Sequence, residues 1–259
     1  MNLFSLFKKR KSDRPTASVK APERLKWKDT EGSLNSEKDL TGRFCSRPFV
    51  KYAVQEDGLV YSCCASWLRL PIGDLRKQDA DALWNSEESK AIRASIHDGS
   101  FRYCDRKLCP EIQNDNLPTV EQARKDPEMA ALIDNEVTIL EDGPGVINFS
   151  NDSSCNLACP SCRVEKIMHT AGPEFDKRKA LNDKVRKAFF ETPTDRTFTI
   201  NVTGSGDPFG SRLFREFLFS LDGASYPNMK VDIQTNGVMF TQKNWDKLEK
   251  IHANLSQFF

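Results

Sequence analysis

The sequence CNLACPSC, residues 155–162, places three thiols in a Cys-x3-Cys-x2-Cys spacing directly after the strand-like run Val146–Ser150. Iron–sulfur cubanes are usually held by four Cys thiolates. Three Cys residues in one loop can therefore fix three irons and leave the fourth iron free for a substrate or cofactor. An open iron indicates chemistry rather than storage, so the rest of the chain is best interpreted as the support of this loop.

Strand and helix signals alternate from Val146 to the end of the sequence, which predicts parallel βα units. The expected strands are Val146–Phe149, Phe198–Val202, Lys230–Gln234 and the beginning of a fourth at Leu255–Phe259; the expected helices run from about 174 to 191, from a Ser211 N-cap to about 221, and onward from a Thr241 N-cap. Unusual residues follow the C-terminal end of each of the first three strands, the face where βα barrels build active sites. We therefore expect three loops to meet around one pocket.

The second and third of these loops are Gly204-Ser205-Gly206-Asp207-Pro208 and Thr235-Asn236-Gly237. Glycine lets a backbone approach a ligand closely, and exposed amide and carbonyl groups can meet its polar end. Both loops also fit a plainer interpretation, because Gly-Pro and Asn-Gly sequences are common turns. A structural zinc site would need only the Cys loop and a fourth ligand such as His169.

The N-terminal half holds the other five Cys residues. The Asp57-Gly58 pair between the apolar runs 49–54 and 59–63 predicts a β-hairpin, and Ser86 to Asp98 is expected to form a helix. These elements bring the later thiols back to the earlier ones, so four of them can close one four-thiolate site: Cys45, Cys63, Cys104 and Cys109. Cys64 is expected to point to the opposite side of its strand. A structural zinc ion is the alternative occupant of the site.

The Cys155 loop, with an apolar strand before it and Arg163 after it, resembles the signature of the radical S-adenosylmethionine (radical SAM) superfamily. The resemblance implies a [4Fe-4S] cluster whose open iron binds SAM, and an electron from the cluster that cleaves SAM to a 5′-deoxyadenosyl radical. The second loop resembles the Gly-Gly-Glu-Pro motif of that family, with Asp207 in the place of Glu. By the same resemblance, the cluster ligands would be Cys155, Cys159 and Cys162, and the SAM contacts would come from Gly204, Ser205, Gly206, Asp207 and Asn236.

The spacing Cys45-x12-Gly58-x4-Cys63 resembles the opening of the SPASM and twitch auxiliary-cluster domains of many radical SAM enzymes. With four suitable thiols, this half is most similar to the smaller twitch type, which implies a second, auxiliary [4Fe-4S] cluster. Families with such domains often modify peptides or proteins. The resemblance thus implies an enzyme that starts radical chemistry from SAM, acts on an unknown substrate such as a peptide or protein, and takes electrons from a reductant such as a flavodoxin or ferredoxin.

The composition sets limits on other functions. Lys plus Arg is 38 against Asp plus Glu at 37, so no large basic field points to nucleic acid. No run approaches the ~18 apolar residues of a membrane span. The sequence contains eight Cys residues and no secretion signal, which favours reduced thiols in the cytoplasm.

The expected fold class is α/β: a partial (βα) radical SAM barrel with parallel strands, preceded by a small Cys-rich α+β domain. The expected division is a flexible segment at 1–42, the auxiliary-cluster domain at 43–112, a linker with a helix at Thr119–Asn135 within 113–145, and the partial core at 146–259. Radical SAM cores typically hold six βα units, so we also expect a fragment or a chain that needs a partner. The alternatives from other classes are a non-catalytic iron–sulfur electron carrier and a zinc-binding interaction module.

Overall fold

The computed structural model describes residues 38–202 and 204–258. The predicted flexible segment 1–42 therefore lies outside the described residues except for 38–42, and so do Thr203 of the second loop and Phe259 of the fourth strand. Within 38–42, Leu40 is buried, and the Lys38 ammonium donates hydrogen bonds to two backbone carbonyls at residues 112 and 113. Residues 38–42 are thus packed against the rest of the chain.

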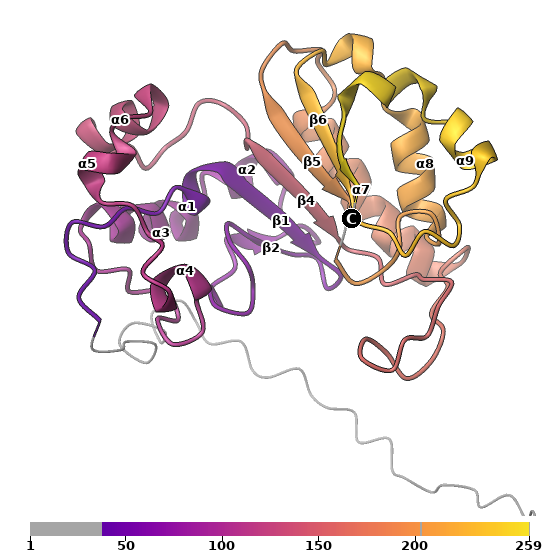
Figure 1. Ribbon diagram of the computed structural model, residues 1–259, viewed down its shortest axis with the longest axis horizontal. Coiled ribbons are helices and arrows are strands. Elements are labelled where there is room, and N and C mark those ends of the chain that lie inside the picture. The colour runs from indigo at the N-terminus through magenta and orange to yellow at the C-terminus, as the bar shows by residue number, and fades with distance from the viewer. Residues whose placement is uncertain (1–37, 203, 259) are drawn as a thin grey trace, which may run out of the picture.

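The centre of the protein is one sheet of seven strands in the order β3-β2-β1-β4-β5-β6-β7 (Figure 1). The strands are β1 Lys51–Gln55, β2 Leu59–Tyr61, β3 Gly73–Asp74, β4 Val146–Ser150, β5 Phe198–Val202, β6 Met229–Ile233 and β7 Leu255–Phe258. Strand β1 and strands β4 to β7 pair in parallel, whereas β2 and β3 add antiparallel pairs at one edge. The prediction of an α/β protein with parallel strands is confirmed.

The predicted hairpin is also present. Strand β1 pairs antiparallel with β2 around the Asp57-Gly58 turn, with Val54 opposite Val60. Gly58 has a φ of +82°, a conformation that glycine adopts without a steric penalty. The other edge of β1 pairs in parallel with β4, from Lys51 opposite Val146 onward. The sheet therefore continues across the predicted boundaries at residues 112 and 145.

Helices α7 (Pro173–Phe189) and α8 (Arg212–Ser220) cover the apolar face of the sheet (Figure 1). Side chains alternate between the two faces of a strand, and the buried residues of β4 to β6 on this face are Ile147, Phe149, Phe198, Ile200, Val202, Met229, Val231 and Ile233. The ring of Phe149 lies 4.6 Å from that of Phe217 in α8. The opposite face carries polar side chains, among them those of Asn148 and Asn201.

Two predicted elements differ from the structure beside a proline. Phe49 and Val50, expected to begin the first strand, instead belong to the short helix α1 (Arg47–Val50), which has Pro48 in its first turn. The expected helix at 119–135 is two helices, α5 (Val120–Ala123) and α6 (Pro127–Asp134). Proline has no amide hydrogen to continue a helix but suits its first turn, so Pro127 ends one helix and starts the next.

A third difference follows Thr241. The expected single helix is α9 (Gln242–Asp246) followed by the 3-10 helix η3 (Glu249–Asn254). The Thr241 hydroxyl caps α9 as expected by accepting a hydrogen bond from the Asn244 amide. The remaining helices are α2 Ala80–Trp84, α3 Glu87–His97, α4 Pro110–Gln113 and the 3-10 helix η2 Gly223–Ser225. No helix among the described residues is long and apolar enough to cross a membrane.

The side chain of Arg93 in α3 ties the N-terminal helices together. Arg93 is fully buried, and its guanidinium donates to three backbone carbonyls and to the Asn85 side chain, while stacking over the Trp84 ring at 4.5 Å. Burial lowers its pKa to about 10. Because the carbonyls come from positions 48, 84 and 138, this one cation fixes α1, α2 and the linker around α3.

Candidate functional site

Four thiols of the N-terminal half line one small cavity of about 20 Å³. They are the four that the sequence predicts: Cys45, Cys63, Cys104 and Cys109. Apart from these thiols, the wall is apolar and is made by Pro48, Trp67, Leu68, Phe101, Ile112 and Leu117. Cys64 lines a different pocket, on the polar face of the sheet. We call the first group the four-thiol cavity.

The four thiols of the cavity come from three segments: two segments contribute one thiol each, and the turn before α4 contributes two. Cys45 precedes α1, Cys63 follows β2, and Cys109 is the N-cap of α4. The turn that carries Cys104 and Cys109 is held by Asp105, whose amide donates to the Trp67 carbonyl at 2.7 Å. The hairpin and the turn after α3 thus meet at the cavity, as the sequence predicts.

Burial shifts the pKa of three of these thiols. It raises the pKa of Cys45 to about 12, and it raises the pKa values of Cys63 and Cys104 as well. The neighbouring sulfurs add to the rise at Cys45 and Cys104, because a second negative charge nearby disfavours ionisation. Four thiolates in an apolar wall need a metal cation or cluster to neutralise them, and its binding releases their protons. Among the described residues, no three His, Cys, Asp or Glu side chains are already spaced to hold a single metal ion.

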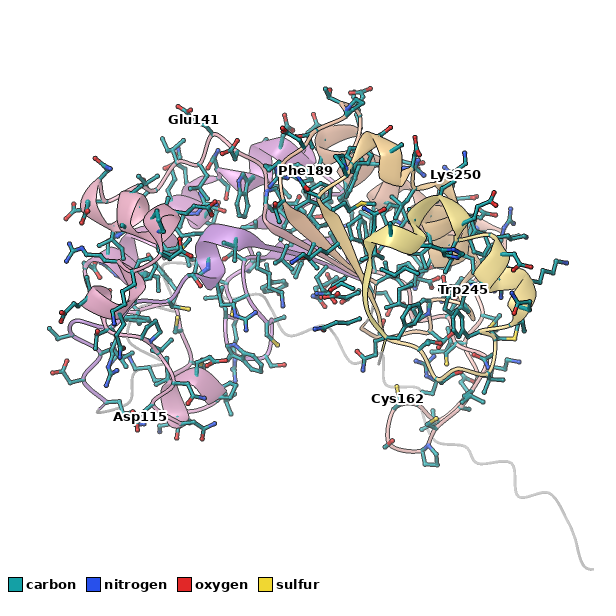
Figure 2. The ribbon with its side chains drawn as sticks, turned by 45° about the horizontal axis from the view of Figure 1, so that its top comes forward. Asp115, Glu141, Cys162, Phe189, Trp245 and Lys250 are labelled. Atoms are coloured by element: carbon teal, nitrogen blue, oxygen red, sulfur yellow. The ribbon has the colours of Figure 1, made fainter. Side chains whose placement is uncertain are left out.

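The second group of thiols lies at the C-terminal ends of β4, β5 and β6. Cys155, Cys159 and Cys162 line a pocket of about 320 Å³ together with residues 204–207 and 234–236. The three strand-end loops therefore do meet around one pocket, which we call the three-thiol pocket. Cys155 is buried, whereas Cys159 and Cys162 are exposed, and Figure 2 shows Cys162 on a loop that extends away from the body of the protein.

Nitrogen donors surround the sulfurs of the three-thiol pocket. The Leu157 amide and the Asn236 side-chain amide both donate to the Cys155 sulfur, at 3.4 and 3.5 Å. The Arg163 guanidinium donates to the Cys162 sulfur at 3.5 Å. Hydrogen bonds to the sulfurs tune the potential of a bound iron–sulfur cluster. The pocket thus offers sulfur ligands in a polar, open setting.

The carboxylate of Asp207 holds the second and third loops together. One oxygen accepts the amides of Phe209 and Gly210, and the other accepts the Thr235 hydroxyl and the Asn236 amide, both at 2.8 Å. Asp207 is almost fully buried. Because both oxygens already accept two hydrogen bonds from the protein, the carboxylate acts as a clamp between the loops.

Two glycines allow the second loop to lie against the first. A Cβ on Gly206 would come within 2.5 Å of the carbonyl oxygens of Asp152 and Ser154, and one on Gly204 would come within 2.3 Å of the Ser150 hydroxyl. The expected approach of this backbone to a ligand stays a prediction. The close approach seen in the structure is between two segments of the chain itself.

Arg163 links the same two loops from the other side. Its guanidinium donates to the carbonyl oxygens of Ser153 and Ser205 as well as to the Cys162 sulfur. The Ser205 hydroxyl oxygen is buried and has no hydrogen-bond partner within the part of the chain that the structure describes. Ser205 thus brings an unused polar atom to the wall of the three-thiol pocket.

A chain of charged groups supports the Cys loop from behind. The Asp152 carboxylate is fully buried, accepts the amide and hydroxyl of Ser154, and lies 3.6 Å from the Arg178 guanidinium of α7. Arg178 also pairs with Glu56 and Glu174, and Glu56 accepts the Ser153 hydroxyl at 2.7 Å. Asp152 and Ser153 lie three and two residues before Cys155. Helix α7 and the hairpin therefore both fix where the Cys loop begins.

Local sequence patterns do not reveal the roles of these supporting residues. Arg163 belongs to the Cys motif, whereas Asp152, Glu56 and Arg178 belong to no motif. The polar run Asn151 to Ser154, directly after an apolar strand, is the feature that could have marked them. Asp152 and Arg178 lie 26 positions apart, Ser153 and Glu56 lie 97 apart, and Arg178 and Glu56 lie 122 apart, which no local pattern reveals.

Comparisons with known proteins bear on the first group of thiols. The model of the SPASM family, an iron–sulfur cluster-binding domain, matches residues 45–110. The match begins at the first thiol of the four-thiol cavity and ends one residue after the last. It indicates that this segment binds an iron–sulfur cluster. No curated protein and no solved structure matches the chain.

Proposed function

We propose that the protein is a radical SAM enzyme with an auxiliary cluster. Cys155, Cys159 and Cys162 would hold a [4Fe-4S] cluster in the three-thiol pocket, and the four-thiol cavity would hold a second [4Fe-4S] cluster. The observation that carries the proposal is the convergence of three strand-end loops on a pocket that offers three thiols rather than four. Three protein ligands leave one iron for SAM.

The donor set of the three-thiol pocket fits such a cluster. Its sulfurs receive hydrogen bonds from Leu157, Asn236 and Arg163, and the pocket is open on the side of the two exposed thiols. When bound, the cluster supplies the electron for the reductive cleavage of SAM. The protein contributes the thiolates, the hydrogen bonds that stabilise them and the walls that receive SAM.

The polar walls suggest how SAM would be received. The Ser205 hydroxyl is buried without a partner among the described residues, and a buried polar group of this kind is normally satisfied by a ligand or water. The backbone of Gly204 to Gly206 lines the pocket beside it. The Asp207 carboxylate is fully engaged, so its part in SAM binding would be to position this backbone and Asn236.

The proposal also covers the fold of the C-terminal half and the partners of the protein. Parallel strands β4 to β7 with α7 and α8 on one face support a partial (βα) barrel. A cytoplasmic protein with reduced thiols would take electrons from a flavodoxin or ferredoxin and would act on a peptide or protein. The predicted domain division at 43–112, 113–145 and 146–259 stays part of the proposal.

The test is the formation of 5′-deoxyadenosine from SAM by the anaerobically reconstituted and chemically reduced protein. The control variant is Cys159→Ala, because this thiol is exposed and its loss should not disturb packing. Cys64→Ala removes a thiol that lines neither thiol site, and it serves as the matched variant because this assay contains SAM and reductant but no substrate. The proposal expects product from the natural protein and from Cys64→Ala, and none from Cys159→Ala.

Two other results would replace the proposal. Iron with labile sulfide but no product from the natural protein would indicate a non-catalytic iron–sulfur electron carrier. Zinc without sulfide in anaerobically purified protein would indicate a zinc-binding interaction module.

A further inference from the structure

A third pocket lies on the polar face of the sheet, between the two thiol sites. Its volume is about 380 Å³. It shares Cys63 with the four-thiol cavity, and it shares Gly204 and Ser205 with the three-thiol pocket. A molecule in this pocket would therefore touch the walls of both thiol sites. We call it the sheet pocket.

The walls of the sheet pocket are mostly neutral and polar. Strands β1 and β4 present their same-face side chains to it, and the loop after β2 completes it: Ala53, Gln55, Asn148, Ser150, Cys64, Ala65 and Ser66. Its one carboxylate, that of Glu56, already pairs with Arg178 and accepts the Ser153 hydroxyl. The acidic charge of the pocket is thus neutralised by the protein itself.

The sheet pocket is lined by one cationic side chain, that of Lys51. Lys51 lies at the start of β1 and is half-buried. Within residues 38–202 and 204–258, its ammonium group forms no hydrogen bond and no ion pair. A half-buried ammonium is stabilised by a negative group that replaces part of its lost hydration. The pocket therefore favours a ligand that brings a carboxylate to Lys51.

We propose that the sheet pocket binds the substrate of the radical reaction and that the substrate carries a carboxylate, which Lys51 anchors. That the ligand is the substrate of a radical reaction rests on the proposed function. The shared wall at Gly204 and Ser205 places the ligand beside the SAM pocket, while Lys51 fixes its anionic end on β1. The carboxylate belongs either to a small acid or to an acidic side chain of a peptide.

A competing role for Lys51 is electrostatic support of the four-thiol cavity. Burial raises the pKa of Cys63, and the charge of Lys51 opposes that rise. If this were its only role, replacing Lys51 would change the cluster content of the protein and would leave ligand binding unaffected. The two roles thus differ in what they predict for the same variant.

The test measures binding by titration calorimetry to the full chain, reconstituted with iron and sulfide and without SAM. The probes are succinate against succinamide, and an end-blocked pentapeptide with a central glutamate against the same peptide with glutamine. The variants are Lys51→Gln, Lys51→Arg and Lys230→Gln. Lys230 is the matched control, because strand register places it in the same cross-strand row as Lys51, on β6 and outside the pocket.

The proposal expects a carboxylate probe to bind more tightly than its neutral partner by about tenfold or more, since hydrogen bonds to charged groups are the strong ones. Lys51→Gln should lose this preference, whereas Lys51→Arg and Lys230→Gln should keep it. Preference for succinate alone assigns a small acid, and preference for the glutamate peptide alone assigns a peptide.

Three results would overturn the assignment. They are equal binding of charged and neutral probes, an equal loss in Lys51→Gln and Lys230→Gln, and a loss of iron and sulfide in Lys51→Gln with unchanged probe binding. Because SAM is absent from the titration, the result is independent of whether 5′-deoxyadenosine forms. If the protein binds the carboxylate probes but does not cleave SAM, the proposed function is refuted and the carboxylate-binding site still stands.

Discussion

The two thiol sites of this protein are built in opposite ways. The four-thiol cavity has a volume of about 20 Å³ and an otherwise apolar wall, whereas the three-thiol pocket has about 320 Å³ and polar walls. Four thiols with little space leave no position for an exchangeable ligand. Three thiols beside an open pocket leave a position for such a ligand. The contrast separates a site that supports structure or electron transfer from a site that can bind a reacting molecule.

The two sites also differ in what holds them. The four-thiol cavity is enclosed by side chains of the smaller hydrophobic core, including Phe101, Ile112 and Leu117. The three-thiol pocket is held by polar contacts between loops, through Asp207 and Arg163. Changes that break one site should therefore spare the other, and the following variants test that separation from the largest expected effect to the smallest.

Cys104→Ser should have the largest effect, because it removes a ligand from the enclosed site. We expect about four irons per chain to be lost, and the free energy of unfolding to fall by about 4 kcal/mol or more, as is typical of losing a metal site. Iron content and a thermal unfolding curve measure both. Cys64→Ser is the control, and an equal loss of iron in that variant would contradict the assignment of four ligands.

Gly206→Ala should come next and should act on the other site. The new Cβ would meet two backbone carbonyl oxygens at 2.5 Å, and neither can rotate away. Overpacking of this kind costs about 3 kcal/mol, and the second loop should move off the Cys loop. We expect iron to be lost from the three-thiol pocket alone.

Gly145→Ala is the control for that variant, since its Cβ would make only ordinary contacts, the nearest at 3.6 Å. Unchanged iron content in Gly206→Ala would show that the contact between the two loops is not needed for the site.

Asp207→Asn should have a moderate effect. The asparagine side chain has one acceptor oxygen in place of two. Its amide nitrogen would face either the Thr235 hydroxyl and the Asn236 amide, or the amides of Phe209 and Gly210, and that pair of hydrogen bonds would be lost. We expect a loss of about 2 kcal/mol in the free energy of unfolding and weaker binding of SAM. Asp222→Asn, at the cap of a 3-10 helix, is the control. Normal SAM binding by Asp207→Asn would mean that the clamp does not position the pocket.

Glu174→Gln should have the smallest effect, on the outermost member of the support behind the Cys loop. Hydrogen bonds from Lys177 and Arg178 lower the pKa of Glu174 from 4.5 to about 2. A lowered pKa means that the pair stabilises the protein fully above pH 4.5 and that this contribution is lost as the pH falls toward about 2.

The unfolding midpoint of Glu174→Gln should therefore lie slightly below that of the natural protein above pH 4.5, with a difference that shrinks in acid. Asp183→Asn, which breaks the exposed pair with Lys179 on the same helix, is the matched control and should lower the midpoint above pH 4.5 by less than Glu174→Gln does. A difference for Glu174→Gln that grows in acid would contradict the role of this carboxylate.

Local patterns predicted much of this molecule. The Asp57-Gly58 turn, the Ser86 cap of α3 and the alternation of apolar residues in β5 each reflect forces within a few residues. The meeting of the three loops followed from the rule that parallel strands end on one edge of a sheet. The convergence of the four thiols on one cavity followed from the hairpin and the helix that returns the chain.

The remaining features depend on contacts between distant segments. Pairing of β1 with β4 joins residues 95 positions apart, and nothing near Lys51 indicates that its neighbour will be Val146. The glycines of the second loop lie against Ser150 and the carbonyls of Asp152 and Ser154, a contact within the chain that no local pattern indicates. Such roles become visible only when the loops are packed together.

The central claim, that one thiol site is open to SAM and the other is closed, is tested most directly by electron paramagnetic resonance of the reduced, reconstituted protein with and without SAM. The measurement compares the natural protein with Cys104→Ser and Cys159→Ala. The account predicts that SAM changes the cluster spectrum of the natural protein and of Cys104→Ser, and leaves that of Cys159→Ala unchanged. A SAM-dependent change that persists in Cys159→Ala and disappears in Cys104→Ser would contradict it.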